Sequence, residues 1–198
     1  MKTVLFLLLL WIGSASSAFV ITEGKCPDVS AQRSLKFERY MGRWYEYMRF
    51  PSPLQPSLQC TSAHYEQLSD GSVKVVNDGY IRAELFNRNF VLDRWVAEGF
   101  ADVPDPKKLA EFSVSFPPLD SKGQINYRII RTDYHRTAVV HSCYEIWNAN
   151  IQFAWILTRE RGVRPRNLDR LFRELTNYGV DISNFITVDQ RNCPTDTP

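Results

Sequence analysis

Apolar side chains alternate with polar ones over several short segments in the middle of the chain. Within residues 109–116, for example, Phe112, Val114 and Phe116 alternate with a glutamate and two serines. Such alternation is typical of a strand with one buried face, and clusters of proline, glycine and aspartate separate these segments. The segments lie at residues 42–50, 60–68, 72–81, 90–103, 109–116, 124–131, 137–146 and 151–158. This spacing predicts an all-β barrel or sandwich. The Asp-Gly step at residues 70–71 predicts a turn that joins the second and third strands as a hairpin.

The hydrophobic period changes after the last of these segments. Residues 165–175 have apolar side chains with helical spacing, at Leu168, Leu171, Phe172 and Leu175. Pro165 near the start and Gly179 just past the end are typical helix boundaries. A single amphipathic helix that follows a series of strands is expected to pack its apolar stripe on the outside of the sheet. A short last strand is expected at residues 185–188.

The N-terminal segment has a composition of its own. Lys2 precedes an apolar run at residues 4–12, and small residues follow at positions 13–18. This arrangement predicts a secretory signal peptide over residues 1–18, which is too short and wrongly flanked for a membrane anchor. We therefore expect a secreted, extracellular protein in which residues 19–198 form one domain.

Charge and cysteine content narrow the classes further. The formal net charge of +2 is small and spread along the chain, which argues against a nucleic-acid or membrane-surface protein held by electrostatics. Four cysteines in a secreted chain predict two disulfides, and the sequence leaves three pairings open. They are Cys26, Cys60, Cys143 and Cys193. No C-x-x-C motif is present and the three histidines are scattered, so no metal site is predicted.

Three short motifs occur in a fixed order along the predicted strands. Gly42-Arg43-Trp44 begins the first strand, Thr132-Asp133-Tyr134 lies between the sixth and seventh, and Arg159 ends the eighth. Together, after a signal peptide and before one helix, these motifs resemble the lipocalin family, and segments 24–27 and 189–194 resemble its apolipoprotein D-like group. The resemblance covers the whole mature chain. It implies an eight-stranded antiparallel up-and-down barrel with one outer C-terminal helix and an interior wide enough for one small ligand.

The resemblance also implies a structural role for the motif residues. In this family the motif tryptophan, here Trp44, packs under the motif arginine, here Arg159, at the closed end of the barrel. A guanidinium over an indole face is a cation–π contact worth about 0.5–2 kcal/mol. The structural set implied for the closed end is Gly42, Trp44, Thr132, Asp133, Tyr134 and Arg159.

The group's pattern implies the disulfides Cys26–Cys143 and Cys60–Cys193. With all four cysteines paired, no thiol remains for catalysis, which counts against the prostaglandin D synthase variety of lipocalin, whose activity needs a free cysteine in the cavity. The sequence also contains no Ser/His/Asp grouping with credible spacing, so no catalytic residue is predicted and an isomerase acting in the cavity is the weaker alternative.

Strand alternation predicts which side chains line the barrel interior. It places Tyr65, Asn77, Phe116, Tyr127 and Trp155 inside, and the resemblance implies ligand-binding positions at the same five residues. Flat rings with polar tips suit a small hydrophobic ligand with a rigid or conjugated skeleton. The candidates are a lipid, steroid, retinoid, fatty acid, bilin or carotenoid, and no other cofactor is required. For each aromatic residue taken singly, simple filling of the core is the alternative.

Apolar residues in two predicted loops leave open a second function, an interaction through the outer surface of the protein. Apolar residues at Pro53-Leu54 and Ile146-Trp147 fall in predicted loops, where they would suit contact with a receptor, a lipoprotein, a membrane surface or another copy of the chain. Ordinary loop hydrophobes are the alternative. Arg94 is the nearest candidate for binding a ligand carboxylate, against the alternative that it is an exposed strand charge.

Overall fold

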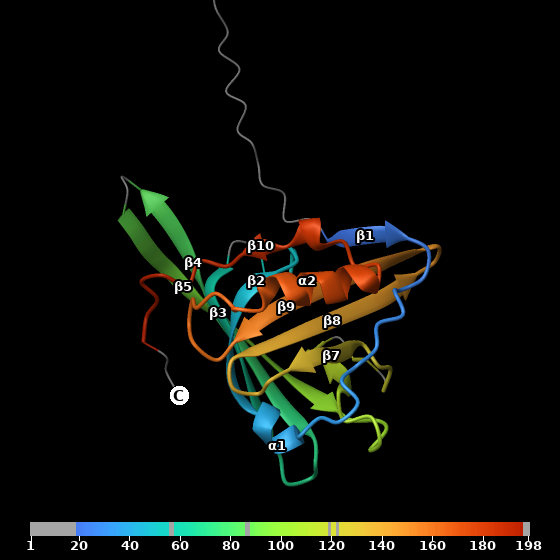
Figure 1. Cartoon of the computed structure of the whole chain (residues 1–198). Helices are drawn as coiled ribbons and strands as arrows, with labels where there is room; N and C mark the ends of the chain where they lie inside the picture. The colour runs from blue at the N-terminus through green and yellow to red at the C-terminus, as the bar shows by residue number, and fades with distance from the viewer. Residues whose placement is uncertain (1–18, 56–57, 86–87, 119, 122, 196–198) are drawn as a thin grey trace, which may run out of the picture.

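The structure of the chain is a computed structural model that describes residues 19–195, except 56–57, 86–87, 119 and 122 (Figure 1). The predicted signal peptide, residues 1–18, lies outside the described residues. Among those that are described, no helix is both long and apolar enough to cross a membrane.

One antiparallel sheet contains every strand that the structure describes. The strands are β1 (Val20–Glu23), β2 (Gly42–Arg49), β3 (Leu58–Gln67), β4 (Val73–Leu85), β5 (Arg88–Asp102), β6 (Glu111–Ser115), β7 (Tyr127–Thr132), β8 (Thr137–Ile146), β9 (Ala149–Thr158) and β10 (Ile186–Thr187). Strands β2 to β9 pair in sequence order, and β9 pairs again with β2, which closes the barrel. The fold is therefore the predicted eight-stranded antiparallel barrel. Two short strands add to it, β1 paired with β9 and β10 paired with β2.

The eight predicted strands correspond to β2 to β9, with ends that differ by a few residues. The predicted turn at residues 70–71 joins β3 to β4, where Gln67 pairs with Val73 and Gly71 has a φ of +90°. Strand β1 was not predicted. Its four residues pair with residues 149–152 of β9, so a distant strand rather than a local pattern determines its conformation.

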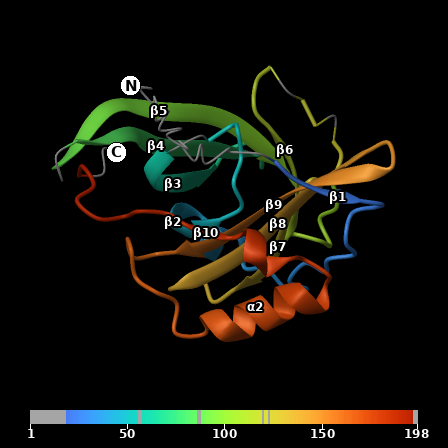
Figure 2. The same ribbon diagram turned by 90° about the horizontal axis from the view of Figure 1, so that it is seen from above.

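Helix α2 (Leu168–Asn177) follows the barrel, as the helical period predicts, and lies on its outside (Figure 2). Its buried side chains Leu168, Leu171 and Leu175 pack in one cluster with Ala154 and Ile156 on the outer face of β9. Arg131 on β7 also binds Glu174 on the helix, with 2.7 Å between Arg131 Nη2 and Glu174 Oε1. Short helices α1 (Phe37–Tyr40) and η1 (Ile182–Asn184) complete the described structure.

Strand β2 departs from simple alternation. Its pairing with β9 shifts between Glu46 and Met48. This bulge moves the side chains of the residues after it to the opposite faces of the sheet. Unbroken alternation would put Phe50 on the same face as Trp44. In the structure Trp44 belongs to the inner cluster, whereas Phe50 belongs to the outer cluster against α2.

Candidate ligand-binding site

The closed end of the barrel gathers around Arg159. Its guanidinium carbon lies 3.8 Å from the centroid of the Trp44 ring, and Trp44 itself is fully buried. The guanidinium donates hydrogen bonds to five backbone carbonyls, those of Tyr134, Arg43, Arg39, Tyr40 and Met41. Arg159 thereby joins α1, the start of β2 and the β7–β8 turn.

The other motif residues support the same end. Asp133 accepts hydrogen bonds from the backbone N–H groups of His135, Arg136 and Thr137, which shape the β7–β8 turn. Partial burial raises the pKa of the Asp133 carboxyl, but these three hydrogen bonds outweigh it, so the net pKa is lowered. Gly42 has a φ of +89°, and a Cβ there would lie 3.5 Å from Arg159 Nη1, so glycine suits the position.

Three tyrosine hydroxyls meet inside the barrel just above this closed end. The Tyr65 and Tyr127 hydroxyl oxygens are 2.6 Å apart, and the Tyr40 and Tyr127 oxygens are 3.4 Å apart. We call this group the tyrosine cluster. Burial raises the pKa of Tyr65 to about 12 and raises the pKa values of Tyr40 and Tyr127 well above their usual range, so all three hydroxyls are neutral at physiological pH. Tyr40 was not predicted as an interior residue, because it lies on the short helix α1 rather than on an alternating strand.

Aromatic rings continue from the tyrosine cluster along the inner wall. Tyr127 stacks on Phe112, with 5.8 Å between ring centroids, and its other neighbour is Trp155 at 6.1 Å. Trp155 in turn stacks on Phe153 at 6.0 Å with an interplanar angle of 8°. Tyr127, Phe153 and Trp155 are only half-buried, although each belongs to an inward-facing position.

The two remaining predicted residues lie on the same inner face of the sheet. Phe116 lies so close to Gly99 of β5 that a Cβ added at Gly99 would come within 2.7 Å of the Phe116 ring. Asn77 pairs with Ala63 of β3, two residues along from the pair between Tyr65 and Val75. Both Phe116 and Asn77 are half-buried. The structure thus brings Tyr65, Tyr127 and Trp155 into one contacting chain of rings, with Phe116 and Asn77 elsewhere on the inner face.

Two arginines of strands β2 and β5, Arg49 and Arg94, are each paired with a carboxylate. Buried Arg49 lies 2.9 Å from the Glu46 carboxylate and also donates to the carbonyls of Gln55 and Leu58. Arg94, the sequence candidate for a ligand carboxylate, instead binds Asp78 at 3.1 Å and is an exposed strand charge. The Glu46–Arg49 pair was missed because alternation assigns these two residues to opposite faces, and the β2 bulge reverses that.

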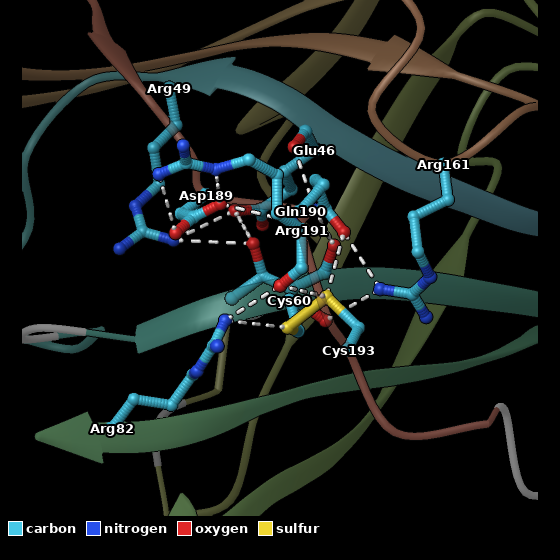
Figure 3. The surroundings of a disulfide bond; sticks show 10 residues. Glu46, Arg49, Cys60, Arg82, Arg161, Asp189, Gln190, Arg191 and Cys193 are labelled. Carbon is cyan, nitrogen blue, oxygen red and sulfur yellow. Dashed lines mark hydrogen bonds and ion pairs between the residues drawn. A yellow bond between two sulfur atoms is a disulfide. The ribbon is translucent and has the colours of Figure 1, made fainter. Parts of the chain in front are cut away.

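Figure 3 shows how the C-terminal segment fastens the barrel beside this ion pair. The Gln190 amide donates to the backbone carbonyls of Glu46 and Thr61, at 2.9 and 2.8 Å, and so bridges β2 and β3 where they diverge. The disulfide Cys60–Cys193 lies next to this bridge, and the disulfide Cys26–Cys143 fixes the N-terminal arm to β8. The structure therefore has both disulfides that the resemblance implies.

Two of the pockets that the described residues form lie on the outer surface of the protein. One, of about 300 Å³, lies beside the start of α2 and includes Arg136 and Asn167; the other, of about 360 Å³, lies between β1 and the segment after α2. Neither is lined by the five residues predicted to bind ligand. Within the described part of the chain, no group of three His, Cys, Asp or Glu side chains is placed to hold a metal ion.

The chain forms a closed eight-stranded antiparallel barrel in which Arg159 covers Trp44 at one end. This is the class of small β-barrel protein that the sequence motifs imply. Residues 35–190 match the family model described as "Lipocalin-like domain". The chain therefore belongs to the lipocalin family, in its apolipoprotein D-like group.

Individual relatives agree with this assignment. Apolipoprotein D of Mus musculus is 31% identical over 172 residues, which is 86% of this chain and 85% of the relative. The Lazarillo protein of Schistocerca americana is 31% identical over 168 residues, covering 83% of this chain and 74% of the relative.

Solved structures show the same fold at lower identity. Lobster apocrustacyanin A1 superposes with a TM-score of 0.66 at 18% identity, over 86% of this chain and 91% of that chain. Insecticyanin from the tobacco hornworm Manduca sexta gives a TM-score of 0.67 at 19% identity, over 88% and 91%.

Proposed function

We propose that this protein is a secreted carrier that holds one small hydrophobic molecule inside its barrel, and that it is not an enzyme. One observation carries this proposal: rings of Tyr127, Phe153 and Trp155 face inward and yet remain half-buried. Three other large rings of the same interior, those of Tyr40, Trp44 and Phe112, are fully buried, so the exposure of these rings is not general to the interior. A flat apolar ligand lying against them would remove that surface from water.

The proposed binding residues are Tyr65, Asn77, Phe116, Tyr127 and Trp155. The tyrosine cluster supplies hydroxyls that both donate and accept hydrogen bonds, and Asn77 supplies an amide. The arginines described above beside the interior, Arg49 and Arg159, are already engaged by a carboxylate or by carbonyls. Because desolvating a carboxylate without a cation is costly, we propose a ligand with an uncharged polar end, such as an alcohol or a carbonyl.

This ligand class includes steroids, carotenoids, uncharged retinoids such as retinol, and neutral lipids. A bilin or a fatty acid carries carboxylates, which would have to stay near the open end of the barrel. Secretion is part of the same proposal, since two disulfides are typical of an oxidising compartment.

Fluorescence titration with a matched ligand pair tests this function. Retinol and retinoic acid share a skeleton and differ in charge at one end, so the proposal predicts tighter binding of retinol. Tyr127→Phe removes one hydroxyl and should weaken retinol binding by about fivefold to tenfold, the worth of one hydrogen bond. Trp147→Phe alters a fully exposed ring outside the barrel and serves as the control.

The outcomes separate the two parts of the proposal. If a panel of neutral and acidic hydrophobic ligands fails to bind, the carrier function is wrong. If retinoic acid binds as tightly as retinol and Tyr127→Phe leaves both unchanged, the carrier function stands and the uncharged-end assignment is wrong.

A further inference from the structure

Strands β4 and β5 continue past the barrel wall as a two-stranded arm (Figure 1). The pairing of β4 with β3 ends at Ile81, whereas its pairing with β5 continues to Leu85 and Arg88. On the other side, β6 pairs with β5 only at Phe100–Asp102. Over residues 88–98, β5 therefore has β4 on one edge and no strand on the other, among the residues that the structure describes.

Several apolar side chains along this part of β5 are exposed. The exposed fractions are 46% for Phe90, 48% for Val91, 63% for Leu92 and 45% for Val96. An edge strand presents unpaired N–H and C=O groups, and a long apolar edge is a template for another strand. A two-stranded ribbon is also only marginally stable by itself. Backbone and side chains together therefore favour a β-strand as the partner.

The outer face of β5 carries a charge pattern that is complementary to itself. Arg94, Val96 and Glu98 pair with Tyr80, Asp78 and Val76 of β4, so all three lie on one face of the sheet. Arg94 Nη2 is 3.1 Å from Asp78, and Glu98 is 3.1 Å from Lys74 Nζ, contacts that hold both charged side chains on that face.

Antiparallel pairing of two β5 edges about a two-fold axis at Val96 satisfies this pattern. Val96 then faces Val96 of the second copy, Arg94 faces Glu98 of the second copy, and Glu98 faces its Arg94. Residues that face one another lie on the same face of the joined sheet, as antiparallel pairing requires. The pairing must stop near Gly99, because Phe100 is already paired with Ser115 of β6.

We propose that two copies of this protein associate through their β5 edges, in antiparallel register centred on Val96. This inference is independent of the ligand, since it uses the outer edge of the barrel. Each dimer gains two cross-strand Arg94–Glu98 pairs and covers Val96 on both copies. Phe90, Val91 and Leu92 lie beyond the paired stretch, because they would face residues 100–102, which already pair with β6.

Charge exchange tests both the association and its register, with sedimentation velocity as the measurement. Arg94→Glu places like charges opposite each other at two points of the dimer, and so does Glu98→Arg. Each variant alone should dimerise at least about tenfold more weakly than the natural chain.

An equimolar mixture of the two variants should regain dimers. In the mixed dimer the glutamate introduced at position 94 of one copy faces the arginine introduced at position 98 of the other. The unchanged Glu98 of the first copy likewise faces the unchanged Arg94 of the second. The mixture keeps the internal cost of each substitution and therefore isolates the contact between copies.

Ile146→Lys provides a matched control, since Ile146 is 47% exposed but lies on β8 away from this edge, and it should leave dimerisation unchanged. A natural chain that stays monomeric at high micromolar concentration overturns the proposal. So does a mixture that associates no better than either variant. If the monomer instead sediments with phosphatidylcholine vesicles and Val96→Lys abolishes this, the arm contacts a lipid surface and the proposed dimer is wrong.

Discussion

Removing the Arg159 guanidinium should destabilise the barrel severely, because three separated segments depend on it. The substitution Arg159→Met keeps most of the side-chain length and deletes the charge. It breaks the hydrogen bonds to the five carbonyls and the contact at 3.8 Å with Trp44.

The size of the effect follows from these contacts. A hydrogen bond to a charged group contributes about 1.5–3 kcal/mol when it cannot be replaced, and the cation–π contact adds about 0.5–2 kcal/mol. Arg159 is half-buried, so water will replace some of the lost bonds. Counting one or two hydrogen bonds as irreplaceable, we expect a loss of about 3–5 kcal/mol in the free energy of unfolding. For a chain of this size that lowers Tm by roughly 6–20 °C.

Urea denaturation followed by tryptophan fluorescence measures this loss. Arg159→Lys keeps the charge but cannot reach all of the carbonyls, so it should recover only part of the stability. Arg136→Met is the control, because the Arg136 side chain is 71% exposed and its pair with Asp133 should contribute less than about 1 kcal/mol. A loss below about 1 kcal/mol for Arg159→Met would refute the assignment of the closed end to this residue.

Three further substitutions or conditions test other parts of the structure. Glu46→Gln leaves the buried Arg49 guanidinium without its carboxylate and should cost about 3–5 kcal/mol in the free energy of unfolding, measured in urea. Gly99→Ala places a Cβ 2.4 Å from the Ser115 carbonyl oxygen and should lower Tm by several degrees; an unchanged Tm would contradict the close β5–β6 approach. The pKa of Tyr65 is raised to about 12 in the folded chain, so its stabilising effect is complete below the ordinary tyrosine pKa of about 10 and is lost as pH rises through 12. Absorbance at alkaline pH should therefore show buried tyrosines that ionise only as the protein unfolds.

Strand alternation alone predicted a barrel or a sandwich, and the resemblance carried by the three short motifs implied the barrel. The outer helix was predicted from its helical period, which the apolar stripe of α2 explains. The motif residues Trp44 and Arg159 meet in the structure as the resemblance implies. What local patterns cannot predict is pairing between distant segments. Strand β1 forms only because β9 offers it an edge, and Gln190 bridges β2 and β3 from the far end of the chain.

Contacts between side chains inside the barrel also depend on distant segments, so local sequence patterns do not predict them. The register of Tyr65 and Tyr127 follows from alternation, but the contact of their hydroxyls with Tyr40 depends on how α1 closes the barrel. The Glu46–Arg49 pair depends on a bulge that no residue type signals. By contrast, Leu54 and Trp147 were predicted as loop residues, and their exposed fractions of 56% and 102% agree with that prediction.

The most direct test of the proposed carrier function is to purify the protein from its native source and identify what it carries. Native mass spectrometry, an absorption spectrum and mass spectrometry of an organic extract would be recorded on the same sample. We predict one small hydrophobic molecule per barrel, with an uncharged polar end, and a visible absorption band if that molecule is a carotenoid. Repeated isolation of an empty, colourless chain that also binds no member of a hydrophobic ligand panel would contradict the proposed function.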